Sequence, residues 1–214
     1  MSKSHCLAAL AAACAALSPS TVTAAERLPA FPHLGEDLSA KSRHRVLANK
    51  VRLGGLAIRL EETRLAELRR RYPALRIRTQ GDASEAETWV CFTVGNGAAQ
   101  FQVWPSSGEL MGGEFIDGVM AQVGQQWPLR DCPRIEVGPG PMELDSRVWI
   151  GTAKADLLKR LGPPTAIADG VMIYDYEVAL RDSKAGACSV VGRLVFELLR
   201  DRVARLAANK TTAC

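Results

Sequence analysis

The sequence predicts an α+β protein of two tandem lobes, each a short helical layer packed on an antiparallel sheet. Three observations lead to this prediction. A strand–helix–Gly-Pro pattern occurs at residues 147–164 and, in a degenerate form, at residues 56–73. Each copy is followed by segments of alternating apolar and polar residues, which are typical of strands with one buried face. A stretch rich in proline and glycine separates the two halves, as at a lobe boundary.

The two copies align when Pro73 is set against Pro163, an offset of 90 residues. This offset places Leu68 on Leu158, so the apolar positions of the two short helices coincide. Identity between the copies is low, and the evidence for a repeat is the shared order of elements. We therefore predict an internal duplication, with most of the glycine and proline positions explained by helix starts and stops.

Residues 1–25 have the three-part order of a secretory signal peptide. A start with one lysine precedes an apolar run at residues 6–17 and a small, polar segment that ends at Ala24 and Ala25. The run is shorter than the roughly 20 residues that a membrane-spanning helix needs. We expect cleavage after Ala24 or Ala25 and a soluble periplasmic or secreted protein. The alternative is a lipid anchor at Cys14, which follows three alanines.

The first lobe is predicted at residues 51–137, after an extended leader at residues 26–50 that contains three turn-forming prolines and glycines. An apolar stretch around a Gly-Gly pair leads into a helix at 61–72, where apolar residues recur at helical spacing and Pro73 marks the stop. Strands are expected at 75–79, 88–94, 98–104 and 109–120, with an Asn-Gly turn between the second and third.

The second lobe is predicted at residues 147–214, after a Gly/Pro linker at 138–146. It begins with a strand at 148–150 and a helix that starts at Thr152 and ends at Leu161, before Gly162. Strands follow at 171–180, 188–199 and 203–208. The order of elements thus repeats that of the first lobe.

Four cysteines remain after the signal peptide is removed, namely Cys91, Cys132, Cys188 and Cys214. An even number in an exported protein predicts two disulfides, with three connectivities open. Pairing within each half is favoured, because Cys91 and Cys188 both open a Cys-x-x-Val-Gly run and each has one later cysteine in its own half. No Cys-x-x-Cys occurs, so no metal site is expected.

Catalysis and nucleic-acid binding have little support in the sequence. A formal charge of +4 is too weak and dispersed for a nucleic-acid surface. The two histidines of the mature chain lie in the leader, and no dinucleotide or phosphate loop occurs, so no cofactor is predicted. Carboxylate pairs at Glu85 with Glu87 and at Asp175 with Glu177 are interpreted as solvated. The protein is predicted not to be an enzyme.

The second lobe carries a recognisable series of short motifs. The series comprises Ile150-Gly151, the helix residues 156–158, the stop at 161–163, Tyr174 and Tyr176, and a hairpin with 194–196 and 203–206. With this series the lobe resembles the SmpA/OmlA lipoprotein of the outer-membrane barrel-assembly machinery, and it is similar to the repeats of the β-lactamase inhibitor protein. The first resemblance implies a structural role and a lipidated cysteine. The second implies a sheet face that binds an enzyme.

The predicted partner surface is an open sheet face that carries aromatic side chains. Strand alternation places Trp89, Gln102 and Trp104 opposite the buried face, and Tyr174 with Tyr176 on one side of their strand. Exposed aromatics often anchor protein partners. We therefore expect a monomeric protein-binding module of the inhibitor or immunity type, acting on an envelope or secreted enzyme. The alternatives are an outer-membrane assembly factor and an unrecognised hydrolase that uses Asp175 or Glu177.

Overall fold

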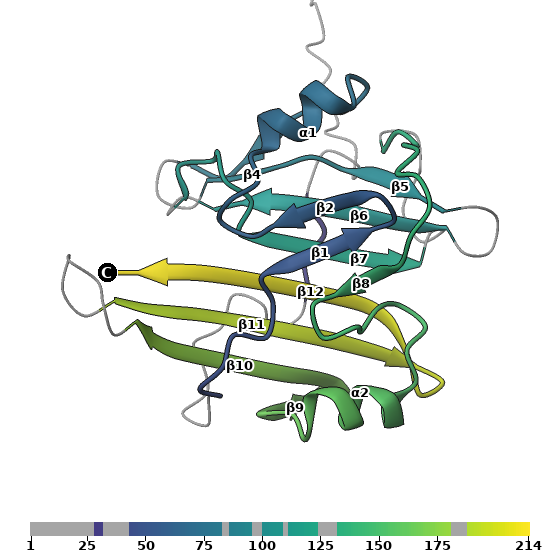
Figure 1. Cartoon of the computed structure of the whole chain (residues 1–214), viewed down its shortest axis with the longest axis vertical. Coiled ribbons are helices and arrows are strands. Elements are labelled where there is room, and N and C mark those ends of the chain that lie inside the picture. Colours follow the sequence, from purple (N-terminus) through teal and green to yellow (C-terminus); the bar gives the residue numbers. More distant parts are fainter. Residues whose placement is uncertain are drawn as a thin grey trace, which may run out of the picture.

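The computed structural model describes residues 28–31, 43–82, 86–95, 100–108, 111–123, 132–180 and 188–214 (Figure 1). The predicted signal peptide, Cys14, most of the leader and the Asn96-Gly97 turn lie outside these residues. The strand and helix assignments below concern the described part of the chain.

A nine-stranded antiparallel sheet, the main sheet, forms most of the structure. Its strands follow the order β3-β4-β6-β7-β12-β11-β10-β9, and β5 also pairs with β6. The strands are β3 (Arg78–Gln80), β4 (Glu87–Trp89), β5 (Phe92–Val94), β6 (Phe101–Ser107), β7 (Gly118–Val123), β9 (Ala166–Ala168), β10 (Val171–Leu180), β11 (Cys188–Leu199) and β12 (Arg202–Ala213).

A second, three-stranded sheet lies over one face of the main sheet, at the front of Figure 1. Its strands are β1 (Lys50–Leu53), β2 (Leu56–Arg59) and β8 (Met142–Leu144), with β1 in the middle. Gly54 makes the β1–β2 turn with a φ of +60°, a conformation that favours glycine. Its amide donates a hydrogen bond of 2.9 Å to the Pro141 carbonyl. The segment predicted as a linker is therefore part of this small sheet.

The predicted α+β class with helical layers is wrong, because the chain is mainly β. The two helices, α1 (Leu65–Arg71) and α2 (Lys154–Leu161), have 7 and 8 residues and lie near opposite ends of the main sheet (Figure 1). The layer that covers the sheet is largely the β2-β1-β8 sheet. Alternation and glycine positions predict strands, but they do not specify which element covers a sheet face.

The strand order of the main sheet is symmetrical about the β7–β12 pair. Outward from this pair, the strands on each side follow the reverse of their order in the chain, β7-β6-β4-β3 on one side and β12-β11-β10-β9 on the other. In each half, the first residue of the helix also donates a hydrogen bond to the segment just before the last strand of that half. The Leu65 amide donates to the Glu114 carbonyl at 3.0 Å. The Lys154 amide likewise donates to the Asp201 carbonyl at 2.9 Å.

The donors of these equivalent hydrogen bonds, at positions 65 and 154, give an offset of 89 residues between the two helices, and the acceptors, at positions 114 and 201, are 87 residues apart. The predicted offset was one larger. The burial pattern agrees with 89, because Leu68 and Leu157 are both buried, whereas Leu158 is only partly buried. Low identity between the copies makes a shift of one residue invisible in the sequence. The symmetrical sheet is the arrangement that an internal duplication would produce.

Two predicted strands occur with their predicted bounds, and the others do not. The segments 171–180 and 188–199 are β10 and β11. The segment 88–94 is divided into β4 and β5 at Val90 and Cys91, where the Val90 amide still donates to Pro105 of β6 at 3.1 Å. The segment 148–150 is not a strand, because Val148 closes a turn by accepting a hydrogen bond from Leu144.

The predicted disulfide pairing is confirmed. Cys91 bonds Cys132 and Cys188 bonds Cys214, across 41 and 26 residues of chain. By restricting the unfolded chain, a loop of either length contributes about 3 to 4 kcal/mol to stability. Within the described residues, no helix is both long and apolar enough to cross a membrane.

Candidate binding cleft

The five residues predicted to form an open partner surface are all buried. Their exposed fractions are 1% for Trp89, 1% for Gln102, 4% for Trp104 and 0% for Tyr174 and Tyr176. The alternation predicted from the sequence is confirmed, since Gln102 and Trp104 face away from Val103. The prediction that side chains on this second face are exposed to solvent is wrong, because both faces of the main sheet are covered.

Tyr174 and Tyr176 belong to the core beneath the small sheet. The Tyr174 ring meets Phe196 edge to face at 5.8 Å between centroids. The Tyr176 hydroxyl donates a hydrogen bond of 2.8 Å to the Asn209 carbonyl of β12. Buried tyrosines are common where the hydroxyl finds an acceptor, as it does here. These side chains hold strands together and offer no surface to a partner.

Trp89 and Trp104 lie on the opposite face of the main sheet, in a second apolar cluster with Met120 and Val195. The leader segment 28–31 packs on this cluster through Leu28 and Phe31. The sequence signal for this cover is weak, because Leu28 and Phe31 sit in a proline-containing segment without helix or strand periodicity. The leader was predicted to be only an extended lead-in.

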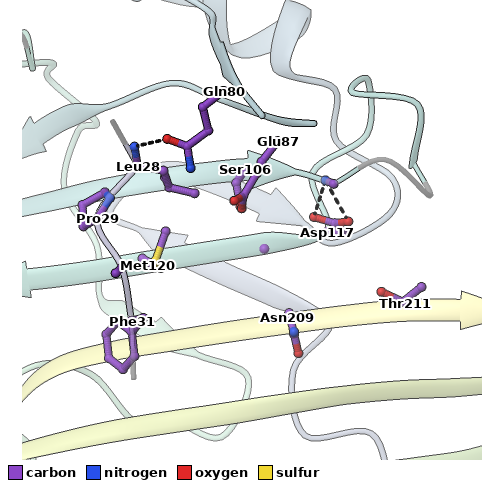
Figure 2. Close-up of a pocket in the computed structure, with 13 residues that line it drawn as sticks. Leu28, Pro29, Phe31, Gln80, Glu87, Ser106, Asp117, Met120, Asn209 and Thr211 are labelled. Atoms are coloured by element: carbon purple, nitrogen blue, oxygen red, sulfur yellow. Dashed lines mark hydrogen bonds between the residues drawn. The ribbon is translucent and has the colours of Figure 1, made fainter. Parts of the chain in front are cut away.

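A cavity of about 430 Å³ opens beside the leader on the same face (Figure 2). One wall is apolar and the floor is polar, an arrangement typical of ligand-binding sites. We call this cavity the acidic cleft, because it holds two carboxylates. The apolar wall comprises Leu28, Pro29, Phe31 and Met120; the polar lining comprises Gln80, Glu87, Ser106, Asp117, Asn209 and Thr211.

Asp117 is held at the entrance to β7, directly before Gly118. The Gly108 amide donates to its two carboxylate oxygens at 3.2 and 3.1 Å, as the dashed lines of Figure 2 show. Burial raises the pKa of Asp117 to about 6, the Gly108 hydrogen bond opposes this rise, and the nearby charges of Glu87 and Glu61 add to it. Asp117 therefore changes its charge near neutral pH.

Glu87 is the first residue of β4 and lies beside Ser106 of β6 (Figure 2). Burial raises the pKa of Glu87 above 4.5, while a side-chain hydrogen bond with Ser106 lowers it. No lysine or arginine among the described residues pairs with Glu87 or with Asp117. Lys210, the neighbour of Asn209 and Thr211, directs its ammonium group to Glu61 at 3.0 Å instead.

Two partly buried carboxylates without a cation favour two kinds of chemistry. Ionised, they bind an ammonium or guanidinium group by charge-assisted hydrogen bonds. Protonated in part, a carboxyl group with a pKa near 6 transfers protons as a general acid or base. No group of three or more potential metal ligands occurs among the described residues.

The carboxylates proposed from sequence for a hydrolase do not form a site. Asp175 is 0% exposed and its carboxylate is paired with the buried guanidinium of Arg193. Glu177 lies within β10 and is exposed, opposite Val191 of β11. Of the two histidines in the leader, His44 is exposed and His33 lies outside the described residues.

Sequence reasoning missed the acidic cleft. Glu87 was interpreted as one of a solvated pair with Glu85, and Asp117 was not singled out. The available signal was weak, an aspartate directly before the largely apolar run at 118–123. Comparison of the chain with protein-family models, with curated proteins and with solved structures found no match. The function must therefore be inferred from the cleft itself.

The raised pKa of Asp117 predicts a pH-dependent stability. A folded-state pKa of about 6 against an ordinary value of 3.8 means that the folded protein binds this proton more tightly. The resulting stability is complete below pH 3.8 and is lost as the pH rises through 6. Asp117→Asn should therefore raise the free energy of unfolding at pH 7.5 by about 1–2 kcal/mol, after allowing for solvent screening.

Urea denaturation at pH 3.5 and 7.5 measures this effect, with Glu177→Gln, an exposed carboxylate within β10, as the control. The advantage of Asp117→Asn should shrink to a few tenths of a kcal/mol at the lower pH. An equal gain at both values would show that charge burial is not its cause.

Proposed function

We propose that the protein is an exported protein-binding module that receives a basic side chain of its partner in the acidic cleft. The observation that carries the proposal is the pair Glu87 and Asp117, which share a cavity with an apolar wall and have no cationic partner among the described residues. A lysine or arginine side chain matches both parts, because its alkyl stem contacts apolar surface while its head binds carboxylates.

The proposed setting is the periplasm or the extracellular space. Two disulfides within the described chain suit an oxidising compartment. The inhibitor or immunity-type role stays part of the proposal, with the contact surface moved from the buried aromatic residues to the cleft. A protein without a basic side chain at this point would, on binding, leave the two carboxylates desolvated and without a counter-charge. The charge match therefore also gives specificity.

The test uses small probes that carry only the recognised group. N-acetyl-lysine methylamide and N-acetyl-arginine methylamide are titrated against the protein by NMR, with N-acetyl-norleucine methylamide as the uncharged match. We expect dissociation constants on the order of millimolar for the two cations at pH 7.5, which corresponds to about 4 kcal/mol. Binding should weaken at pH 5, because Asp117 is then largely protonated.

A double variant, Glu87→Gln with Asp117→Asn, should weaken cation binding at least tenfold, which is about 1.4 kcal/mol. Asp156→Asn, which removes an exposed charge on α2, is the matched control and should bind as the wild type does. Equal binding of the cations and the norleucine probe would contradict the proposal. So would shifts in the NMR spectrum that map away from the cleft.

A hydrolase is the second candidate, and the pKa of about 6 at Asp117 is the observation that favours it. A general acid or base beside a second carboxylate is the minimal set for hydrolysis of a glycosidic bond. A measurement of product release distinguishes the two candidates. A hydrolase converts its substrate to product, and the Asp117→Asn variant loses this activity. A binding module forms no product.

A further inference from the structure

The leader segment 28–31, which we call the strap, crosses the face of the main sheet that carries Trp89 and Trp104. It is held at both ends by side chains of the sheet. The Leu28 amide donates to the Gln80 side-chain oxygen at 2.9 Å. At the other end, Arg205 donates to the Ala30 carbonyl at 3.2 Å, and its guanidinium carbon lies 4.8 Å from the centre of the Phe31 ring.

The strap is not a strand of the sheet. Within the part of the chain that the structure describes, it makes no backbone–backbone hydrogen bond with any strand. The strands β6, β7 and β12 pair with one another beneath it, and this pairing does not involve the strap. Release of the strap would therefore leave the hydrogen bonds of the main sheet in place.

The groove beneath the strap is lined by apolar side chains. Pro29 and Phe31 pack against Trp104 and Met120, and Arg205 closes one side. Leu28 is 9% exposed, so the strap also buries its own apolar residues. An extended segment with an apolar residue, a proline and an aromatic residue therefore fits this groove.

Two buried hydrogen-bond donors lack partners, one on Arg205, which lines the groove, and one on Gln102, which is bonded to the lining residue Gln122. Gln102 Nε2 has no acceptor, although its oxygen accepts a hydrogen bond of 3.1 Å from Gln122. Arg205 Nε also has none, although its two terminal nitrogens bond Glu197 and Ala30. A buried donor without an acceptor is destabilising, because it has lost its hydrogen bonds to water. The strap is thus an incomplete occupant, and a segment with carbonyl oxygens at these two points would bind better.

We propose that this groove is a docking site for an extended segment of the partner protein, and that the strap occupies it until the partner displaces it. The partner segment carries an apolar residue, a proline and an aromatic residue in the order seen in the strap, with backbone carbonyls that reach Gln102 and Arg205. The inference rests on the proposed function, since it specifies the partner's second point of contact beside the acidic cleft, whose apolar wall the partner segment then forms in place of Leu28, Pro29 and Phe31. A tethered strap competes at an effective concentration on the order of millimolar, which lowers the apparent affinity of any free segment.

The test measures binding of a fluorescent peptide with the sequence of residues 26–33 to the full chain. Three proteins are compared, namely the wild type, Gln80→Ala, and the double variant Leu28→Ser with Phe31→Ser. We expect the peptide to bind the double variant at least about tenfold more tightly than the wild type, with Gln80→Ala between them. A peptide in which the leucine and phenylalanine are replaced by serine should not bind.

Three results would overturn the proposal. One is a peptide that fails to bind a double variant whose near-UV circular dichroism is unchanged. Another is loss of that signal in the double variant, because the strap would then be part of the core rather than an occupant. The third is dimerisation of the double variant in sedimentation, which would assign the groove to a second copy of the chain.

The acidic cleft and the groove can be tested separately if cation binding is measured in a protein that keeps its strap, because Leu28 and Phe31 also form part of the cleft wall. Glu87→Gln with Asp117→Asn should remove cation binding from the otherwise wild-type protein. The same two changes, added to the strap double variant, should leave peptide affinity within about twofold. Peptide binding without cation binding would support the groove and reject the cleft. The reverse result would reject the groove alone.

Discussion

Replacing Trp89 with alanine is expected to lower the free energy of unfolding by about 3–5 kcal/mol, the range for removing a fully buried aromatic side chain. Trp89 is 1% exposed, in the cluster with Trp104 and Met120. The substitution leaves a cavity between the strap and the sheet that neighbouring side chains fill only in part. Urea denaturation followed by circular dichroism measures the loss.

Ile167→Ala and Leu199→Ala are the controls for Trp89→Ala. Both are apolar residues of the same sheet, and they are 66% and 65% exposed. Each should change stability by less than about 0.5 kcal/mol. A folded Trp89→Ala protein of unchanged stability would show that this tryptophan lies in an open face, as the sequence alone suggested.

Gly192→Ala is expected to destabilise the protein by about 3 kcal/mol or more, at or beyond the upper end of the range for overpacking. A Cβ atom at this position in β11 would overlap the Tyr176 hydroxyl and the Asn209 carbonyl. The second obstacle is backbone of the paired strand β12, which cannot move without disturbing the ladder. The absence of a side chain at Gly192 therefore allows the Tyr176 ring to lie flat across the sheet.

Thermal unfolding compares Gly192→Ala with Ser189→Ala, a substitution in the same strand that removes an oxygen and adds no atom. The Ser189 change should shift the midpoint by no more than about 2–3 °C. If the two variants have the same midpoint of thermal unfolding, the close packing of Tyr176 over β11 is not present in solution.

The sequence predicted those features that local chemistry determines. The strands β10 and β11 have long alternating stretches bounded by glycines and polar residues, so their limits were predictable. The cysteine pairing was predictable because each half contains a similar Cys-x-x-Val-Gly run and one later cysteine. These signals are contained in short segments and need no knowledge of neighbours.

Features that depend on distant segments were not predictable. Alternation shows that Trp104 and Val103 face opposite sides of a sheet, but whether each side is covered depends on elements far away in the chain. Here the strap, more than 70 positions before Trp104, covers one side. The acidic cleft has the same origin, because Glu87 and Asp117 meet only after β4, β6 and β7 have paired in register.

The position of β12 also has a consequence for the order of folding. It is the last of the described strands in chain order, yet it lies between β7 and β11 at the centre of the main sheet. A nascent chain that ends before residue 202 can form the two flanking halves but cannot join them. The pairing of β7 with β12 joins segments far apart in the chain, and such contacts form slowly. The main sheet therefore stays divided into two halves until β12 has been synthesised.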